Sequence, residues 1–195
     1  RYSLAYAMRK RSDNRLFEFD AYVIRSQLDL YSNFTYFLAD PDLGDQFQQS
    51  ERRTVAGVNT SVSWQTELAG FPLRNKLGVQ ARHDKLSPVG LYGTVERARH
   101  STVREDRVRE GSIGLYAENS TQWLPWLRSV AGVRHDAYRF NVASSIEGNS
   151  GKANDGITSP KLSLIFGPWS KTEFFANYGK GFHSNDARGT TQTRL

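Results

Sequence analysis

The clearest strand pattern in this chain is the run Leu77-Gly78-Val79-Gln80-Ala81-Arg82-His83-Asp84. Successive side chains on a β-strand point to opposite faces, so Leu, Val, Ala and His share one face and Gly, Gln, Arg and Asp share the other. A packed core does not accept such charges without partners. The pattern therefore indicates a strand with its polar side toward water and its apolar side toward lipid, as in a transmembrane β-barrel.

Composition fits this interpretation and argues against a helical membrane protein. The 195 residues are 38% hydrophobic, and the mean hydropathy is -0.60. No run approaches the roughly 18 consecutive apolar residues that a membrane-spanning helix needs. A barrel strand needs no such run, because half of its residues are polar. The chain has no cysteine, so neither a disulfide nor a thiolate metal site is expected.

The net charge of +6 does not predict a nucleic-acid partner, because 26 basic residues are interspersed with 20 acidic ones. The densest region, residues 96–110, mixes arginines with four acids, whereas a phosphate-tracking surface is more one-sided. It is predicted to be an exposed loop. Four of its arginines are candidates for binding lipopolysaccharide phosphates or an anionic ligand, against the alternative of solvated loop charge. They are Arg97, Arg99, Arg104 and Arg107.

Alternation between turn signals predicts an all-β fold, an antiparallel meander of about eight strands from a transmembrane β-barrel. The expected strands are about 2–10, 15–24, 54–65, 76–85, 111–122, 127–142, 159–166 and 173–182. Short links alternate with long links at about 32–53, 86–110 and 143–158. In such a meander all short turns lie at one rim and all long loops at the other, as in outer-membrane barrels.

The tryptophans support the same orientation. All four map to the predicted short-turn rim: Trp64, Trp123, Trp126 and Trp169. Amphipathic rings at the level of the lipid headgroups predict such a periplasmic aromatic girdle. The alternative is that they cap the end of a soluble core.

The cost of placing charge in lipid predicts which face is which. An arginine facing lipid near the bilayer midplane costs roughly 2–4 kcal/mol, so the charged faces should point into the lumen. The lumen-facing candidates are Arg82, Asp84, Glu118, Arg134, Asp136 and Asn177. His83 then points outward, near the outer interface.

No catalytic, metal or cofactor site is predicted. The carboxylates in Asp40-Pro41-Asp42-Leu43-Gly44-Asp45 lack the spacing and terminal Glu of a calcium loop, so a Pro/Gly turn is favoured. The four histidines (83, 100, 135 and 183) are far apart in sequence. His183, Ser184 and Asp186 lie too close along an extended segment to form a catalytic triad.

Four segments follow one another with hairpin spacing and carry a family resemblance. They are Tyr116-Ala117-Glu118-Asn119, Val130-Ala131-Gly132-Val133-Arg134-His135-Asp136, Ser159-Pro160-Lys161-Leu162-Ser163-Leu164 and Phe175-Ala176-Asn177-Tyr178-Gly179-Lys180-Gly181-Phe182. Together they resemble the middle barrel strands of TonB-dependent outer-membrane receptors. The resemblance implies a parent barrel of 22 strands with an N-terminal plug, importing a scarce nutrient such as a ferric siderophore, and no enzymatic activity.

Residues 1–195 are then expected to be a partial barrel domain without the plug, a signal peptide or the C-terminal closing strand. The resemblance implies the outer membrane of a Gram-negative bacterium. It also implies contact with membrane lipid and lipopolysaccharide, a small-molecule or metal-chelate ligand, and the TonB complex through the missing N-terminal region. Two alternatives remain. One is a porin or autotransporter translocator, and the other is a soluble carbohydrate-binding β-sandwich.

Overall fold

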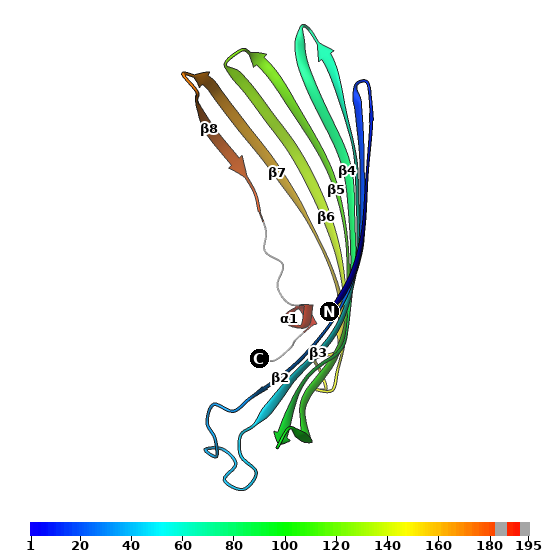
Figure 1. Cartoon of the computed structure of the whole chain (residues 1–195), viewed down its shortest axis with the longest axis vertical. Helices are drawn as coiled ribbons and strands as arrows, with labels where there is room; N and C mark the ends of the chain where they lie inside the picture. The colour runs from blue at the N-terminus through cyan, green and yellow to red at the C-terminus, as the bar shows by residue number, and fades with distance from the viewer. Residues whose placement is uncertain (182–186, 192–195) are drawn as a thin grey trace.

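The computed structural model describes residues 1–181 and 187–191 as one curved antiparallel sheet with a short helix on its concave side (Figure 1). The strands are β1 (Tyr2–Ser12), β2 (Arg15–Ser32), β3 (Phe47–Leu68), β4 (Phe71–Val95), β5 (Ala98–Leu124), β6 (Leu127–Ser144), β7 (Gly151–Trp169) and β8 (Thr172–Gly179), and the helix is α1 (Ala187–Thr191). No helix in this described part is long and apolar enough to cross a membrane. The segment 182–186, with the end of the last predicted strand and His183, lies outside the described residues.

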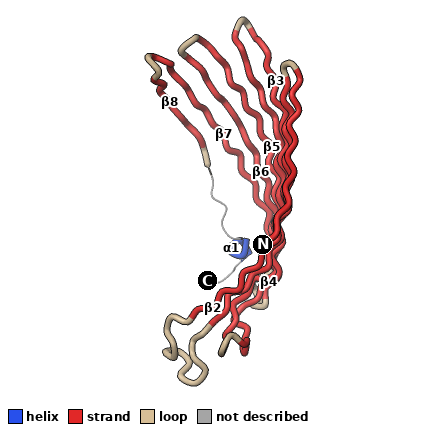
Figure 2. The backbone as a smooth tube through the Cα atoms, in the orientation of Figure 1, coloured by secondary structure: helices blue, strands red, loops and turns tan. Residues whose placement is uncertain are grey.

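The strands pair in chain order from β1 to β8, which confirms the eight-strand antiparallel meander (Figure 2). The β-sandwich alternative is wrong, because all eight strands of the described residues belong to a single sheet. Such a sandwich would need a second sheet to cover the apolar face. In the described residues neither face of the sheet is covered by a second sheet.

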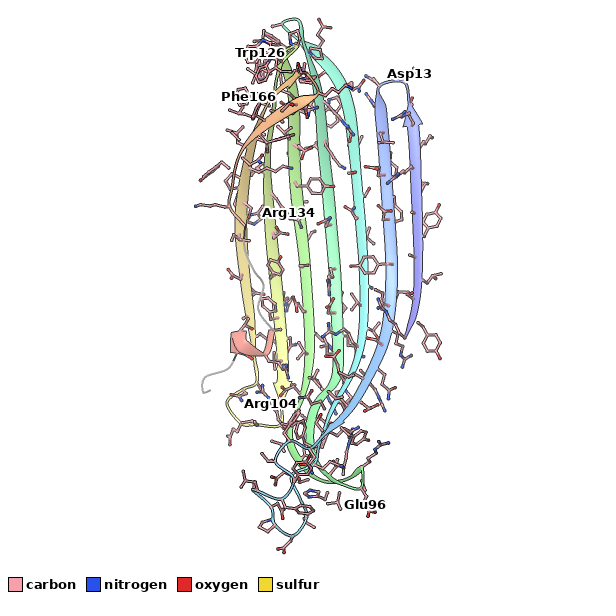
Figure 3. All side chains as sticks on the ribbon, turned by 60° about the vertical axis from the view of Figure 1, so that its left-hand side comes forward. Asp13, Glu96, Arg104, Trp126, Arg134 and Phe166 are labelled. Carbon is pink, nitrogen blue, oxygen red and sulfur yellow. The ribbon has the colours of Figure 1, made fainter. Side chains whose placement is uncertain are left out.

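Two-residue turns join the strands at one end of the sheet. Two of these turns, Ala69-Gly70 and Ser170-Lys171, have positive φ at both residues, the geometry that matches the twist of paired strands. Figure 3 places Asp13 and Trp126 at this end and Glu96 at the other. The predicted common rim for the short turns is therefore present.

The predicted long loop over residues 86–110 is wrong. The backbone stays paired up to Val95 and again from Ala98, so a two-residue turn, Glu96-Arg97, joins strands of 25 and 27 residues. Three register shifts interrupt this pairing. This stretch lacks the strict alternation of residues 77–84, so the sequence does not mark it as strand. The other long links are also shorter than expected, at 33–46 and 145–150.

The charged face of the sheet is its concave face. The helix α1 lies on the concave side (Figure 1), and its Ala187 packs on Val108, Phe140 and Val142. Strand pairing and two-residue alternation place these residues on the same face as Arg82, Asp84, Arg134 and Asp136. The convex face carries the apolar partners, among them Val79, Ala81, Leu115 and Val133.

Tyrosine rings on the concave face lie over glycines of the neighbouring strands. Gly57 pairs with Tyr22 and Gly78 with Tyr116, and a Cβ built on either glycine would lie 2.5 Å or 2.2 Å from the ring carbon that bears the hydroxyl. An aromatic ring laid across a glycine covers backbone that has no side chain of its own. Glycine is therefore needed here for close approach.

Replacing Gly78 with valine is expected to destabilise the protein by about 1–3 kcal/mol, because the Tyr116 ring must leave its place. Urea unfolding measures the change. Gly111→Val is the control, because the nearest atom to a Cβ there is a His83 nitrogen at 3.9 Å. Equal unfolding midpoints for the two variants would contradict the packing argument.

Candidate functional site: the polar wall of the concave face

Arginine and aspartate two residues apart form ion pairs along single strands of the concave face. Arg82 on β4 donates from Nε and Nη2 to the two carboxylate oxygens of Asp84, both at 2.7 Å. Arg134 on β6 binds Asp136 in the same way, at 2.7 Å and 2.6 Å. The spacing works because residues i and i+2 of a strand share a face. Bidentate pairing is the strongest geometry of this kind.

Sequence reasoning missed a third pair of the same design. On β5, Arg104 donates from Nε to Asp106 Oδ2 at 2.8 Å, and the Asp106 side chain is fully buried. The repeated Arg-x-Asp spacing at 82/84, 104/106 and 134/136 was the available signal. Figure 3 shows Arg134 and Arg104 at different heights along the sheet.

The aspartates are buried while the arginines keep contact with solvent. The side chains of Asp84 and Asp136 are 8% and 2% exposed, against 53% for Arg82 and 33% for Arg134. Gly114 makes room for the second pair, since a Cβ there would lie 2.3 Å from Arg134 Nη2. The guanidinium groups are therefore the parts of these pairs that face solvent on the concave side of the sheet.

Further hydrogen bonds on the concave face join strands that lie two apart in the sheet. Arg134 Nη1 donates to Gln80 Oε1 at 2.6 Å, and Lys76 Nζ donates to Glu18 at 3.2 Å. Glu118 accepts a bond from Lys161. Asn177 lies on the same face, opposite Ser163, at the β8 edge. The structure thus brings all six predicted lumen-facing residues to one face.

A cavity of about 360 Å³ opens on this face next to α1. Its polar lining includes Glu51, Arg53, Arg82, Asp84 and Glu110. Arg53 donates to Glu51 at 3.0 Å, so a further acid–arginine pair borders the cavity. Such a surface can hydrogen-bond a polar ligand or a polar protein segment, because it presents both donors and acceptors.

The four candidate arginines do not form one cluster. Arg104 lies on the concave face in its pair with Asp106, whereas Arg107 is exposed on the convex face, three residues along β5. Arg99 stacks 3.7 Å from the centre of the Tyr92 ring and donates to Gln48 Oε1 at 2.5 Å. Arg97 lies 5.6 Å from the centre of the Tyr31 ring. Binding of one ligand by all four arginines remains a prediction. Their separation argues against it.

Aromatic side chains gather at the short-turn end. Trp126 stacks with Trp169 at 6.1 Å between ring centres, and Trp123 lies 5.3 Å from Phe71 and donates to Ser129 Oγ. Trp64 lies on β3 opposite Arg15 and Asn75. Sequence reasoning missed the phenylalanines of this rim, among them Phe174, 6.2 Å from Trp169. Their position near turns was the available signal.

The carboxylates of the 33–46 loop accept hydrogen bonds from the backbone amides of the same loop. Asp45 accepts hydrogen bonds from the amides of Ala39 and Asp40, and Asp40 accepts from the amides of Asp42 and Leu43. Hydrogen bonds from Thr35 and then from Ala39 hold the pKa of Asp45 below its usual value. Within the described residues no group of three or more His, Cys, Asp or Glu side chains could hold a metal ion.

Comparisons with known proteins identify this architecture. A family model described as TonB dependent receptor-like, beta-barrel matches residues 1–193. No curated protein matches the chain by sequence. The fold resembles the ferric citrate transporter FecA in its unliganded form, with a TM-score of 0.74 and 12% identity over 91% of this chain and 26% of that chain.

A second similar structure is the open form of the ferric-catecholate import receptor Fiu from E. coli K12. It matches with a TM-score of 0.66 and 9% identity, over 91% of this chain and 35% of that chain. At such identities the likeness shows the fold alone, and the chain spans well under half of either neighbour. The family consists of outer-membrane receptors of Gram-negative bacteria and not of enzymes. With its family model matched over nearly the whole chain, this protein belongs to the TonB-dependent receptors and forms part of their β-barrel.

Proposed function

We propose that this chain is part of the barrel wall of a receptor that takes up a scarce nutrient, such as a ferric siderophore, across the outer membrane. The observation that carries the proposal is the separation of the two faces. The concave face holds the Arg82–Asp84 and Arg134–Asp136 pairs, while Val79, Ala81 and Val133 lie on the convex face of the same strands. This arrangement supports a polar, water-filled interior and a lipid-facing exterior.

The two similar structures are a ferric citrate transporter and a ferric-catecholate import receptor. They favour an iron chelate as the class of ligand for the proposed receptor. The plug and the TonB-contacting segment would come from parts of the receptor other than these strands. The polar wall would then contact the plug, the permeating ligand, or both, through the solvent-facing arginines.

The test is uptake of radiolabelled iron by a strain that lacks the full-length receptor. Loss of uptake for one ferric chelate, restored by the intact gene only when TonB is present, is the expected result. A porin or autotransporter would pass its substrate without TonB. Unchanged uptake of every ferric chelate, or uptake that persists without TonB, would overturn the proposal.

A further inference from the structure

A notch opens where two hairpins end at different levels at the short-turn end of the sheet. The β1–β2 turn ends level with Trp64, since Arg15 pairs with Trp64 and the Gln65 amide donates to the Asn14 carbonyl. β3 and β4 continue to the turn at Ala69-Gly70, so the β1–β2 hairpin stops short of the next hairpin (Figure 1). A cavity of about 240 Å³ lies in this step.

One step further along the concave face, four strands together hold a carboxylate. Glu18 on β2 lies 3.3 Å from Arg9 of β1 and 3.2 Å from Lys76 of β4. Ser61 of β3 donates a hydrogen bond to the same carboxylate at 3.4 Å. These four residues, called the inner layer below, surround one carboxylate with two cations and a hydroxyl.

The same arrangement recurs one step toward the rim, but without the carboxylate. A move of two residues along each of the four strands keeps the face of the sheet. It leads to a second set of four residues, the rim layer: Arg11, Leu16, Ser63 and Arg74. All four line the notch. The rim layer repeats both flanking cations and the serine, and Leu16 stands where the inner layer has Glu18.

The donors of the rim layer lack a visible acceptor. Ser63 is 3% exposed, and its Oγ has no hydrogen-bond partner. No ion pair found in the described residues includes Arg11, Arg74 or Asp13, the one acid among the described residues that line the notch. A buried hydroxyl without a partner costs free energy, and an incoming oxygen acceptor would recover it.

We propose that the rim layer binds one carboxylate that the sheet itself does not supply. Arginine donates paired N–H groups to carboxylate oxygens, and Ser63 donates as Ser61 does to Glu18. The rim layer lies on the concave face, opposite the apolar convex face. The carboxylate therefore comes from a dissolved anion or from an acidic side chain elsewhere in the receptor. The inference does not depend on the transported ligand.

The test titrates the full-length receptor in mild detergent with sodium acetate, while sodium chloride keeps the ionic strength constant. Trp64 lines the notch, so the fluorescence that disappears in the Trp64→Phe variant reports on it. A dissolved carboxylate as the occupant predicts a saturable change in the wild type. Leu16→Glu supplies the missing carboxylate and should abolish this change, whereas the uncharged Leu16→Gln should keep it.

A second comparison removes the cations. The variant that combines Arg11→Gln and Arg74→Gln should bind acetate about tenfold more weakly than the wild type. The matched control combines Lys10→Gln and Lys171→Gln, two exposed cations near the same end of the sheet. Neither lysine lines the notch, so this control should bind acetate like the wild type.

An acidic side chain of the receptor as the occupant predicts a different pair of results. The wild type then does not respond to acetate, and the two-arginine variant unfolds at a lower urea concentration than the two-lysine control in acetate-free buffer. Equal unfolding midpoints without any acetate response would overturn the proposal. So would an acetate response that Leu16→Glu or the two-arginine variant retains in full.

Discussion

Val58→Arg is expected to lower the free energy of unfolding of the full-length receptor by roughly 2–4 kcal/mol, whereas Asn59→Arg should change it little. Val58 lies on the convex face between Ala21 and Ala81, where an arginine would face lipid. Asn59 lies on the concave face opposite Asp20, where an arginine meets water and a nearby carboxylate. Urea unfolding in lipid vesicles measures both variants.

These two adjacent positions test the register directly. They share the strand, nearly the same depth in the membrane and the introduced residue, and they differ in the face and in the residue replaced. A shift of the sheet by one residue would exchange them. If Asn59→Arg were the more damaging substitution, the assignment of the concave face to the lumen would be wrong.

Asp136→Ala should destabilise the receptor by about 3 kcal/mol, at the lower end of the range for breaking a buried ion pair. The Asp136 side chain is 2% exposed and the Arg134 side chain 33%. Removal of the Asp136 carboxylate therefore leaves the partly desolvated Arg134 guanidinium without its ion-pair partner. Unfolding in urea is again the measurement. The free energy of unfolding should fall more in the single variant Asp136→Ala than in the double variant that also carries Arg134→Ala.

A surface pair supplies the control for this effect. Arg9 lies 3.3 Å from Glu18 with its side chain 78% exposed, so Arg9→Ala should cost less than about 1 kcal/mol. Should Asp136→Ala prove no more harmful than Arg9→Ala, the buried pairs would contribute nothing special to the wall.

The membrane-spanning part of this fold is predictable from the sequence because lipid imposes a pattern on it. Residues 77–84 must place Val79 and Ala81 outward and Arg82 and Asp84 inward, and that alternation identifies strand, face and register together. Pairing in chain order then follows from the short turns. The eight-strand meander could therefore be predicted without any knowledge of tertiary contacts.

Prediction failed where that constraint ends. Residues 86–110 lie beyond the alternating stretch at 77–84, and the side chains there make contacts such as those of Tyr92 with Arg99 and Glu105. Such contacts join residues that local alternation does not relate. For the same reason the stacking of Arg99 on Tyr92 could not be deduced from the sequence. The pairing of Arg104 with Asp106 had a signal only in the Arg-x-Asp spacing.

The paired hairpin of β4 and β5 limits which parts of the outer surface can move. Its strands stay bonded up to the two-residue turn at Glu96-Arg97, so the hairpin cannot fold over the barrel opening without breaking a ladder of backbone bonds. Gln46 ties the end of the neighbouring 33–46 loop to it, since Gln46 Oε1 accepts bonds from the Arg97 amide and the Thr94 hydroxyl. The end of the 33–46 loop therefore cannot separate from the hairpin without breaking the two hydrogen bonds to Gln46 Oε1.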